Sequence, residues 1–564
     1  MGPEKITYLT RARPNPPNSI GIKFTVLTLL LLSVSAIVSS AKNFYVNPDS
    51  TKTTIIEPEA FQNLEAGDTI FLVAGKYKQI LIKNIKGTPP DPIIITNSGR
   101  LVHITDGPTY GIAIRKSSNL VLTGNPLSEL ALRITDISNG NGISVEDFSS
   151  DVEISGIEIR NVNKSGIMIK SDPSCQINSP DRSNFILKNI SIHHNLIYQT
   201  GDEGFYIGSS FYGGVTLDCS GQVITKLPHI IENLSVYKNT LIKTGKDAIQ
   251  ISSIPEGSEV FENSIWFDSE QQSNQQMSGI FIGGGAKSTI YNNFIKDGSG
   301  SGIEVLGKPG TLIFNNIIIN PGKSYKPELA PNNFAKHGIY VKNALNEPSF
   351  SIQILNNTIL NPKTNGITVD SPLNNPSQIR NNAIINPGVY PLTRSRSFIF
   401  IEQSQEDVSI LTNYMGLNSN SLFQVKDDFD YYPASDSPLI NAGSETLVPD
   451  ITFDFLNMPR PMNNQMDIGA VEYQELIEAV DEPIVLNLFP NPTNEVLNLV
   501  FSHQALDQIE ISLYSLEGKQ LTVPFNKTDT TLFYTFELQS LPRGAYKVVV
   551  KINDSIYSKT FIKR

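Results

Sequence analysis

The chain has 564 residues, more than one compact core accommodates, so several domains or one elongated repeat body are expected. Charged residues make up 18% and aromatic residues 9%, with 39 Gly and 35 Pro, which excludes a disordered polar chain and favours a turn-rich, mostly β protein. The formal net charge is −11, and a surface this acidic argues against nucleic acid or an anionic membrane as the partner.

The first predicted element is a secretory signal peptide over residues 1–41. An apolar run, "FTVLTLLLLSVSAIV" (Phe24 to Val38), follows several basic residues and precedes small residues that end at Ala41. The run is shorter than the roughly 20 apolar residues that span a bilayer. We therefore expect cleavage after Ala41 and an exported protein, in preference to a membrane anchor.

A repeated phrase follows, in which a small residue precedes a short alternating strand such as "GISV" or "GIEV". An asparagine column precedes these strands, and its spacing gives a basic unit of about 24 residues without a helical period. Such a unit is typical of one coil of a parallel β-helix, with the apolar residues of the phrase pointing inward. The small residues are Gly111, Gly142, Gly166, Gly204, Ala248, Gly279, Gly302, Gly338 and Gly366, and the asparagines are Asn195, Asn239, Asn263, Asn293, Asn316, Asn357 and Asn382.

Residues 42–475 resemble the right-handed parallel β-helix proteins of the pectate-lyase-like group. The opening "FYVNPDS…LEAGDTIFLVAGKY" (Phe44 to Tyr77) is similar to the first coil of the branch that includes chondroitinase B and alginate lyases. The stretch from "SPLINAG" to "DIGAVEYQ" (Ser437 to Gln474) is similar to the end of many bacterial surface β-helix proteins. The resemblance implies the fold and leaves the reaction open, because this fold carries lyases, hydrolases, epimerases and adhesins.

The C-terminal part is predicted to be a separate domain. An acidic stretch without the repeat suggests a linker over residues 476–484, and residues 485–564 then alternate apolar and polar positions as in a small β-sandwich. The phrases "PNPTNEVL", "YSLEGK" and "LPRGAYKV" resemble, in that order, the C-terminal sorting domain of type IX secretion cargo. This implies handling by the type IX secretion machinery and a place outside the cell or on the outer-membrane surface. A carbohydrate-binding or immunoglobulin-like module is the alternative.

The chain has two cysteines, Cys175 and Cys219, and each follows a repeat phrase. They therefore lie in loops that leave neighbouring coils at a similar place. In an exported protein we expect a disulfide bond between these loops, and two separate buried thiols are the alternative.

Charged residues gather at one corner of the predicted coil. The stretches "TGDEGFYIG" and "TGKDAIQIS" place Asp202, Glu203, Lys246 and Asp247 at equivalent positions of neighbouring coils. Aromatic rings offer faces on which sugars stack, and four outward strand positions nearby are predicted to bind substrate. These positions are Tyr206, Phe281, Glu304 and Tyr340.

Two reactions fit this corner. Glycoside hydrolysis uses two carboxylates, roughly 5–5.5 Å apart in retaining enzymes and 6.5–9.5 Å apart in inverting enzymes, and Glu203 and Asp247 are the predicted pair. Lyase chemistry on a uronate needs a base, for which Lys246 or Lys164 is the candidate, and a cation for the sugar carboxylate. Asp202, Glu203 and Asp247 would then bind calcium through oxygen ligands.

Known family patterns do not decide between these reactions. Polygalacturonase-like hydrolases carry two adjacent Asp residues and a later Gly-His-Gly, whereas this chain has Asp202-Glu203 and "KHG" at residues 336–338. The chondroitinase B branch uses a lysine and an arginine on neighbouring coils, and Lys246 has no obvious arginine beside it. His337 is a second candidate acid or base, against a surface role.

Two non-catalytic interpretations stay open. In the first, the corner charges are solvated stacking pairs, Lys246 with Asp202 and Lys164 with Glu203. In the second, the protein is a surface adhesin or glycan-binding protein that needs only the repeat, the loops and the sorting domain. We expect a monomer whose partners are a polysaccharide and the secretion machinery.

Overall fold

The computed structural model describes residues 41–124, 132–331, 333–373, 375–391, 394–402, 408–424, 431–444, 449–462 and 465–474 of the repeat region. In the C-terminal region it describes residues 486–489, 493, 495–501, 509–515, 519–527, 533–552 and 555–563. Residues 1–40 of the predicted signal peptide and the predicted linker lie outside these ranges. Within the described residues, no helix has the length and apolar character needed to cross a bilayer.

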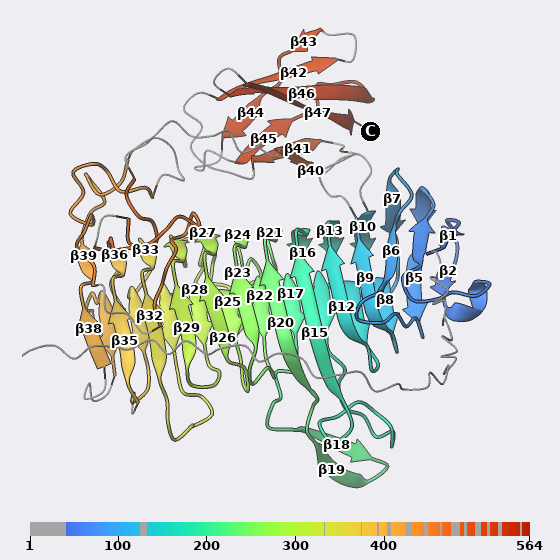
Figure 1. Ribbon diagram of the computed structural model, residues 1–564. Coiled ribbons are helices and arrows are strands. Elements are labelled where there is room, and N and C mark those ends of the chain that lie inside the picture. The colour runs from blue at the N-terminus through green and yellow to red at the C-terminus, as the bar shows by residue number, and fades with distance from the viewer. Residues whose placement is uncertain are drawn as a thin grey trace, which may run out of the picture. The chain divides into compact units, whose positions relative to one another are not determined.

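Three long parallel sheets, here named A, B and C, make up the repeat region (Figure 1). In each full coil a strand of sheet A is followed by one of sheet C and then one of sheet B. Sheet A contains β1 (Asn43–Val46), β3 (Thr69–Leu72), β6 (Ile93–Asn97), β9 (Ser118–Thr123), β12 (Ser150–Ser155), β15 (Ile186–His193), β20 (Ile230–Tyr237), β23 (Ser258–Phe261), β26 (Ser288–Tyr291), β29 (Thr311–Phe314), β32 (Ile352–Leu355), β35 (Ser377–Arg380) and β38 (Val408–Leu411).

The other two sheets have the same order along the stack. Sheet B contains β2 (Thr53–Ile56), β5 (Gln79–Lys83), β8 (Tyr110–Arg115), β11 (Asn141–Glu146), β14 (Ile167–Ile169), β17 (Phe205–Ile207), β22 (Ile249–Ile251), β25 (Ser278–Ile282), β28 (Ser301–Val305), β31 (Ile339–Val341), β34 (Ile367–Val369) and β37 (Ile399–Ile401). Sheet C contains β4 (Gly75–Tyr77), β7 (Val102–Thr105), β10 (Leu132–Ile137), β13 (Ile157–Val162), β16 (Leu196–Thr200), β21 (Thr240–Ile242), β24 (Ser264–Trp266), β27 (Phe294–Lys296), β30 (Ile317–Ile319), β33 (Thr358–Leu360), β36 (Ala383–Ile385) and β39 (Tyr414–Gly416).

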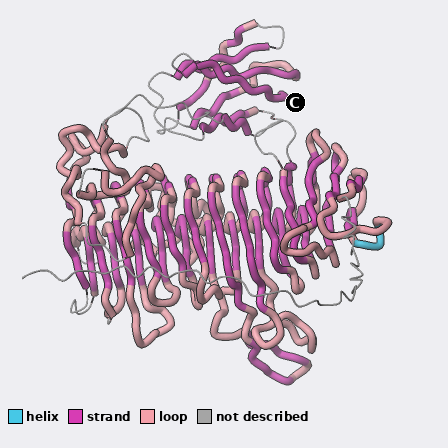
Figure 2. Tube along the Cα trace, in the orientation of Figure 1, coloured by secondary structure: helices cyan, strands magenta, loops and turns pink. Residues whose placement is uncertain are grey.

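Strands dominate the described residues, as Figure 2 shows, with one short 3-10 turn at Pro58–Ala60. The repeated phrase explains why the coils stack. In β28, Ile303 and Val305 are fully buried while Glu304 between them points outward, and the same alternation recurs from coil to coil. The buried isoleucines, leucines and valines of all three sheets form one continuous core along the stack. The all-β, parallel-coil prediction is confirmed.

The asparagine column stacks in the turn between sheets A and C. From Asn195 to Asn413, each side-chain amide donates to the side-chain oxygen of the next asparagine at 2.9–3.0 Å. The same amides also donate to backbone carbonyl groups, for example from Asn316 to Ile290 and Phe314. The side chains of this asparagine column therefore satisfy one another, which is what a dry corner requires.

Residues 417–474, which we call the closing segment, return along the outer side of sheet C. Leu439 and Ala470 pack there against outward side chains such as Phe294 and Leu360. Four of the column asparagines are preceded by a second asparagine in a left-handed conformation, with φ between 52° and 56°. These first asparagines bind the closing segment rather than each other, through Asp454, Phe453, Asp467 and Ser444. They are Asn292, Asn315, Asn356 and Asn381.

The C-terminal region forms two four-stranded antiparallel sheets. One contains β40 (Leu486–Phe489), β41 (Val496–Phe501), β45 (Phe533–Glu537) and β44 (Phe525–Lys527), and the other contains β43 (Gln520–Leu521), β42 (Ile509–Ser515), β46 (Gly544–Ile552) and β47 (Ser555–Lys563). Side chains from both sheets, such as Leu497 and Phe536 from one and Val548 and Phe561 from the other, share one core. The predicted β-sandwich is therefore confirmed.

Candidate functional site

The predicted substrate-binding residues occupy one outward column of sheet B. The strand register pairs Tyr206 with Gln250, Gln250 with Phe281, Phe281 with Glu304, and Glu304 with Tyr340. All but Gln250, which is buried, are half-buried. The five side chains thus follow one another along the face of the sheet, as the sequence predicts.

The aromatic residues of this column are held by polar neighbours. The Lys170 ammonium group lies 4.5 Å from the ring centre of Tyr206, and the Tyr206 hydroxyl lies 3.1 Å from Ser210 Oγ. At the other end, Tyr340 donates its hydroxyl hydrogen to Asp370 at 2.7 Å. Both rings therefore have fixed positions, and both residues are half-buried.

Sheet A carries a different aromatic column, and its rings are not free to bind a ligand. Tyr237, Phe261, Tyr291 and Phe314 stack face to face with centres 4.8–4.9 Å apart. Each ring face is covered by the next ring, so a sugar cannot stack on it. In sheet B, by contrast, Gln250 and Glu304 separate the aromatic residues.

The charged corner lies in the turn between sheets C and B, where Glu203 and Asp247 occupy adjacent coils. The Gly204 amide, next to Glu203, donates to the Asp247 carbonyl oxygen at 3.1 Å. The Lys246 ammonium group pairs with Asp202 Oδ1 at 2.9 Å and lies 4.0 Å from Glu203 Oε1. The structure therefore brings together all four residues that the sequence predicts to be catalytic.

Burial separates these four residues into two layers. Asp202 and Lys246 are partly exposed, whereas Glu203 and Asp247 are only 2% and 0% exposed. Glu203 accepts hydrogen bonds from Ser165 Oγ at 2.9 Å and from Gln276 Nε2 at 3.0 Å. Burial raises the pKa of Glu203. The stacking pair expected between Lys246 and Asp202 is present, and Glu203 binds Ser165 and Gln276 instead of Lys164.

Asp247 is unusual because neither of its buried carboxyl oxygens has a hydrogen-bond partner. Burial, together with the negative charges of Glu203, Glu304 and Asp268, raises its pKa well above the ordinary value. An unpaired carboxylate in this position would be costly, so the side chain is held as the neutral acid. Asp247 is therefore a buried, uncharged carboxyl group without access to a ligand in this conformation.

Glu304 is the accessible member of the acidic group. It stands on β28 between Phe281 and Tyr340, and its Oε2 atom accepts a hydrogen bond from Ser278 Oγ at 3.1 Å. Ser278 belongs to the coil next to Asp247, since the Ala248 amide donates to its carbonyl oxygen. The Glu304 carboxyl group therefore leans back toward the charged corner. Burial raises its pKa, and Lys336 opposes that change.

Two members of this group, Asp268 and Lys336, were not singled out from the sequence. Asp268 follows β24 and lies so close to Gly298 that a Cβ atom there would sit 1.9 Å from its Oδ2 atom. Burial raises the pKa of Asp268 to about 7. Lys336 precedes β31, is buried, and donates to Asn333 Oδ1 at 2.9 Å. Burial lowers its pKa to about 8, against the charges of Glu304, Asp268 and Asp247.

His337 is placed differently from the surface role that its sequence context suggests. It is buried, its ring stacks on Tyr340 with centres 5.4 Å apart, and Nδ1 lies 3.1 Å from both Thr364 and Thr368 hydroxyl oxygens. Burial lowers the pKa of His337 to about 3. The ring is therefore neutral near pH 7 and supports Tyr340, which argues against its role as an acid or base.

The residues named for calcium do not form a metal site. Among the described residues, no three His, Cys, Asp or Glu side chains converge as metal ligands do. Asp202 faces the Lys246 ammonium group, and Asp247 is fully buried. These donors do not fit a calcium ion, and no step below depends on one.

Two grooves of the molecule lie away from the charged corner. One, of about 610 Å³, lies on the outer face of sheet A near Asn233 and Glu259, and the other, of about 640 Å³, lies near Glu59 and Lys116 in the early coils. Neither contains a residue of the charged corner. We favour sheet B because the shifted acids, the lysine and the accessible rings occur together there.

Comparison with known proteins identifies both parts of the chain. Residues 230–413 match the family described as right handed beta helix region, and residues 487–564 match the secretion system C-terminal sorting domain. The chain is a right-handed parallel β-helix protein with a type IX secretion sorting domain. The sorting domain marks this β-helix protein as secreted or displayed at the cell surface.

Several solved structures match this β-helix protein at low identity and low TM-score. A lacto-N-biosidase from Eubacterium ramulus is 12% identical with a TM-score of 0.42, covering 67% of this chain and 68% of that one. An alginate lyase from Paenibacillus is 13% identical with a TM-score of 0.34, covering 67% and 98%. The A-module of a mannuronan C-5 epimerase from Azotobacter vinelandii is 15% identical with a TM-score of 0.31, covering 61% and 91%. No curated protein matches the chain.

Proposed function

We propose that this protein binds a polysaccharide along the outward column of sheet B and cleaves it, with Glu304 as the general acid. The observation that carries the proposal is the position of Glu304. It is a partly exposed residue whose carboxyl pKa is raised by burial, and it stands between two half-buried aromatic residues on the same face. A carboxyl group whose pKa is raised by burial and that lies beside a sugar-stacking surface suits proton donation to a glycosidic oxygen.

Hydrolysis and elimination both need that proton. In hydrolysis the bond between the anomeric carbon and the glycosidic oxygen breaks, the oxygen takes a proton from the acid, and a water molecule supplies a hydroxyl group to the anomeric carbon. In elimination the bond between that oxygen and the uronate ring breaks, the oxygen again takes the proton of the acid, and a base removes a proton from the uronate so that a double bond forms. Asp247 and Asp268 would lie behind Glu304, and because the charges of Glu304 and Asp268 act on Asp247, the three carboxyl groups would titrate as one coupled set. Asp202 and Lys246, which are partly exposed, would bind sugar hydroxyl or carboxylate groups at the far end.

Lys336 is the residue that distinguishes the two reactions. A lyase needs a base for the proton beside the uronate carboxyl group, and an amine with a pKa of about 8 is partly neutral at pH 7–8. A hydrolase gives this lysine no such task. The original lyase candidate, Lys246, is less suited because its ammonium group is paired with Asp202.

The non-catalytic alternative has one observation in its favour. Three of the groups that the proposal invokes, Asp247, Asp268 and Lys336, are almost completely buried. A glycan-binding protein exported to the cell surface would need only the column of sheet B. The loops beside it would select the ligand.

The test uses the full-length chain against alginate, polygalacturonate, xylan and dextran, with reducing ends and absorbance from new double bonds as readouts. We expect cleavage of at least one polymer, and Glu304→Gln to slow it by about 10²- to 10⁴-fold. Glu256→Gln, at an exposed glutamate that precedes β23 and pairs with Lys287, is the matched control and should keep the wild-type rate. Lys336→Met should abolish double-bond formation but not hydrolysis.

Full activity of Glu304→Gln would remove the acid assigned here. Binding to one of the four polymers without any product would support the glycan-binding alternative. The absence of both binding and cleavage would overturn the proposed function.

A further inference from the structure

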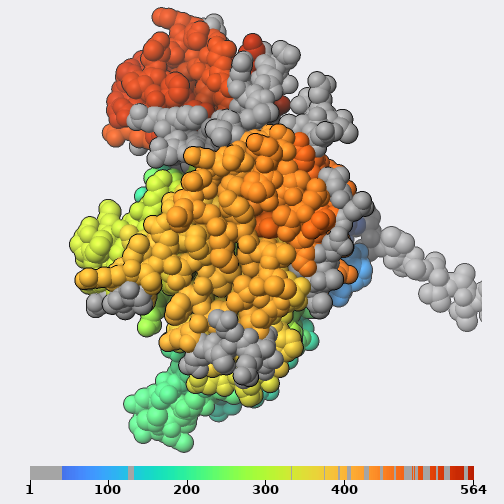
Figure 3. Space-filling model, turned by 90° about the vertical axis from the view of Figure 1, so that its left-hand side faces the viewer, coloured from blue at the N-terminus to red at the C-terminus, as the bar shows by residue number. Residues whose placement is uncertain are grey.

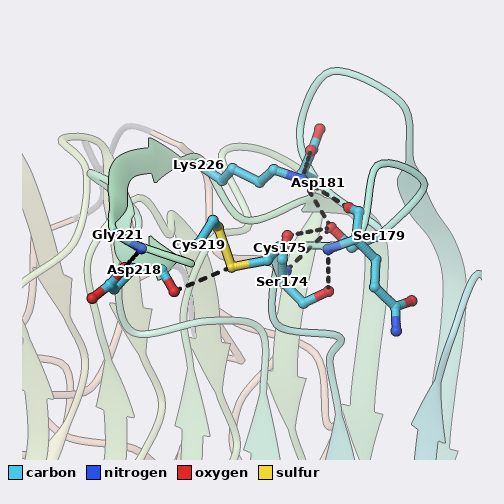
Figure 4. The surroundings of a disulfide bond; sticks show 9 residues. Ser174, Cys175, Ser179, Asp181, Asp218, Cys219, Gly221 and Lys226 are labelled. Carbon is cyan, nitrogen blue, oxygen red and sulfur yellow. Dashed lines mark hydrogen bonds and ion pairs between the residues drawn. A yellow bond between two sulfur atoms is a disulfide. The ribbon is translucent and has the colours of Figure 1, made fainter.

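Two loops that leave neighbouring strands of sheet B are joined into one unit. The first follows β14 and the second follows β17, and the second contains the hairpin β18 (Val215–Cys219) and β19 (Gln222–Lys226). A disulfide bond joins Cys175 to Cys219, with Cα atoms 5.5 Å apart (Figure 4). We call residues 170–185 and 208–229 the stapled loops. In Figure 3 the atoms coloured for residues near 200 project as a lobe from the body.

Other contacts fix the stapled loops to each other. Arg182 donates to the backbone oxygens of Tyr212 at 2.8 Å and Pro228 at 3.1 Å, and its guanidinium group lies 4.2 Å from the centre of the Tyr212 ring. Lys226 donates to Gln176 O and to Ser179 Oγ, both at 3.1 Å. A unit held in this way loses little conformational entropy when it binds a ligand.

The root of the second loop is bonded directly to the candidate site. Ser210 Oγ accepts a hydrogen bond from Gln250 Nε2 at 2.8 Å and lies 3.1 Å from the Tyr206 hydroxyl oxygen. Tyr212 packs on the turn that follows Phe281, where a Cβ atom on Gly285 would lie 2.1 Å from the tyrosine ring. The stretch between Ser210 and Tyr212 is therefore held against the edge of the sheet B column.

Phe211 lies between these two anchors and is 61% exposed. Its neighbours on both sides are bonded or packed, so its exposed side chain is carried by a fixed piece of backbone at the margin of the sheet B column. A rigid, exposed ring at the margin of a binding face is the usual form of an aromatic contact for a ligand. The occupant that fits this position is a polymer that continues from the column.

We propose that Phe211 forms an additional sugar-binding subsite, in which its ring stacks on a sugar unit of the polysaccharide that lies along sheet B. The proposal rests on the proposed function. It adds a contact on the stapled loops to the four residues on the sheet. A polymer long enough to reach both would bind more tightly than a short oligosaccharide.

The test measures binding of the full-length chain in the Glu304→Gln background, so that the polymer stays intact. Retardation in native gels that contain alginate, polygalacturonate, xylan or dextran gives the dissociation constant. We expect Phe211→Ala to weaken binding about 3- to 10-fold and Phe211→Trp to retain it. Val223→Ala is the matched control, because Val223 is 68% exposed on the same stapled loops and has no contact with the column.

Each outcome decides the proposal. A polymer that binds equally well to Phe211→Ala and to the parent overturns the subsite and leaves the sheet B site standing. Equal losses in Phe211→Ala and Val223→Ala overturn it as well, because they would show a general apolar effect of the loops. Retardation by none of the four polymers overturns the proposed function, and the subsite with it.

Discussion

Two turns of the same coil follow opposite rules. In the turn between sheets A and C, one residue type recurs, and the asparagine amides from Asn195 to Asn413 bind one another at every step. In the turn between sheets C and B, the residue changes from coil to coil, and Asp247 has no hydrogen-bond partner for either carboxyl oxygen. A repeated residue whose side-chain amides all find hydrogen-bond partners is what selection for stability produces. Variation with unsatisfied buried acids is typical of a site where chemistry or binding is selected instead.

The comparison predicts its largest effect for Asn316→Ala in the uniform turn. This change removes bonds to the backbone of Ile290 and Phe314, to Asn357, and from Asn293, and leaves those buried groups unsatisfied. We expect a loss of about 3–5 kcal/mol in the free energy of unfolding, measured by denaturant titration. A loss below about 1 kcal/mol would mean that the column is dispensable.

The turn between sheets C and B should instead affect how the free energy of unfolding depends on pH. The pKa of Asp268 in the folded protein is about 7, above its ordinary 3.8, so between these values the folded state holds a proton that the unfolded chain has lost. The free energy of unfolding should therefore fall as the pH rises from about 4 to 7, by about 3 kcal/mol. Asp268→Asn should flatten this slope, and Asp151→Asn, at a partly exposed position on β12 of sheet A, should not. Equal slopes in all three proteins would contradict the assignment.

The first asparagine of each pair offers a comparison within the uniform turn itself. Asn315 binds Phe453 O at 2.7 Å and Arg460 at 2.8 Å, and it has a φ of 52°, which alanine disfavours. Asn315→Ala should cost about 2 kcal/mol, less than its neighbour Asn316. Limited proteolysis should then cut the closing segment before the coils. An undiminished resistance to protease would show that apolar packing alone holds the segment.

The smallest effect is expected for Asp247→Asn. The side chain is already uncharged in the folded protein, so an amide of the same shape changes little, and we expect stability within about 1 kcal/mol of wild type at pH 7. Denaturant titration at pH 7 measures it. Glu203→Gln is the matched variant, whose bonds to Ser165 and Gln276 should make it the more costly of the two. A strongly destabilised Asp247→Asn protein would mean that the carboxyl group has a structural partner.

The sequence predicted the fold well because each coil repeats the same physical requirement. The spacing of the asparagines and of the small residues gave the coil length, and the alternation in phrases such as "GIEV" gave the inward and outward sides. The two cysteines fall at equivalent places in neighbouring loops, and the structure joins them. Chemistry at Asp202, Glu203, Lys246 and Asp247 remains a prediction, although the structure places them together.

The site was predicted less completely because loops of different lengths hide which residues occupy equivalent positions in neighbouring coils. Asp268 lies in the long connection between β24 and β25. Counting back from β25 to the position that is equivalent to Lys246 reaches Met277 and therefore misses Asp268. Lys336 was named as part of the phrase "KHG", which gave no sign of its burial, and its ammonium group binds the loop residue Asn333. Glu304 was assigned to sugar contact alone, because its approach to Ser278 depends on the fold.

The positions of the paired asparagines in the sequence indicate which coils the closing segment contacts. A second asparagine is present where the closing segment passes and absent at earlier coils, where His194 and Lys238 take that position. The farthest contact described, from Asn457 to Glu262, lies one coil beyond the first pair. Removing one coil would shift every later asparagine by about 4.8 Å relative to the closing segment. The closing segment therefore sets the number of coils in a stack whose coils are otherwise interchangeable. A β-helix with fewer coils would need a closing segment that is shortened by the same length.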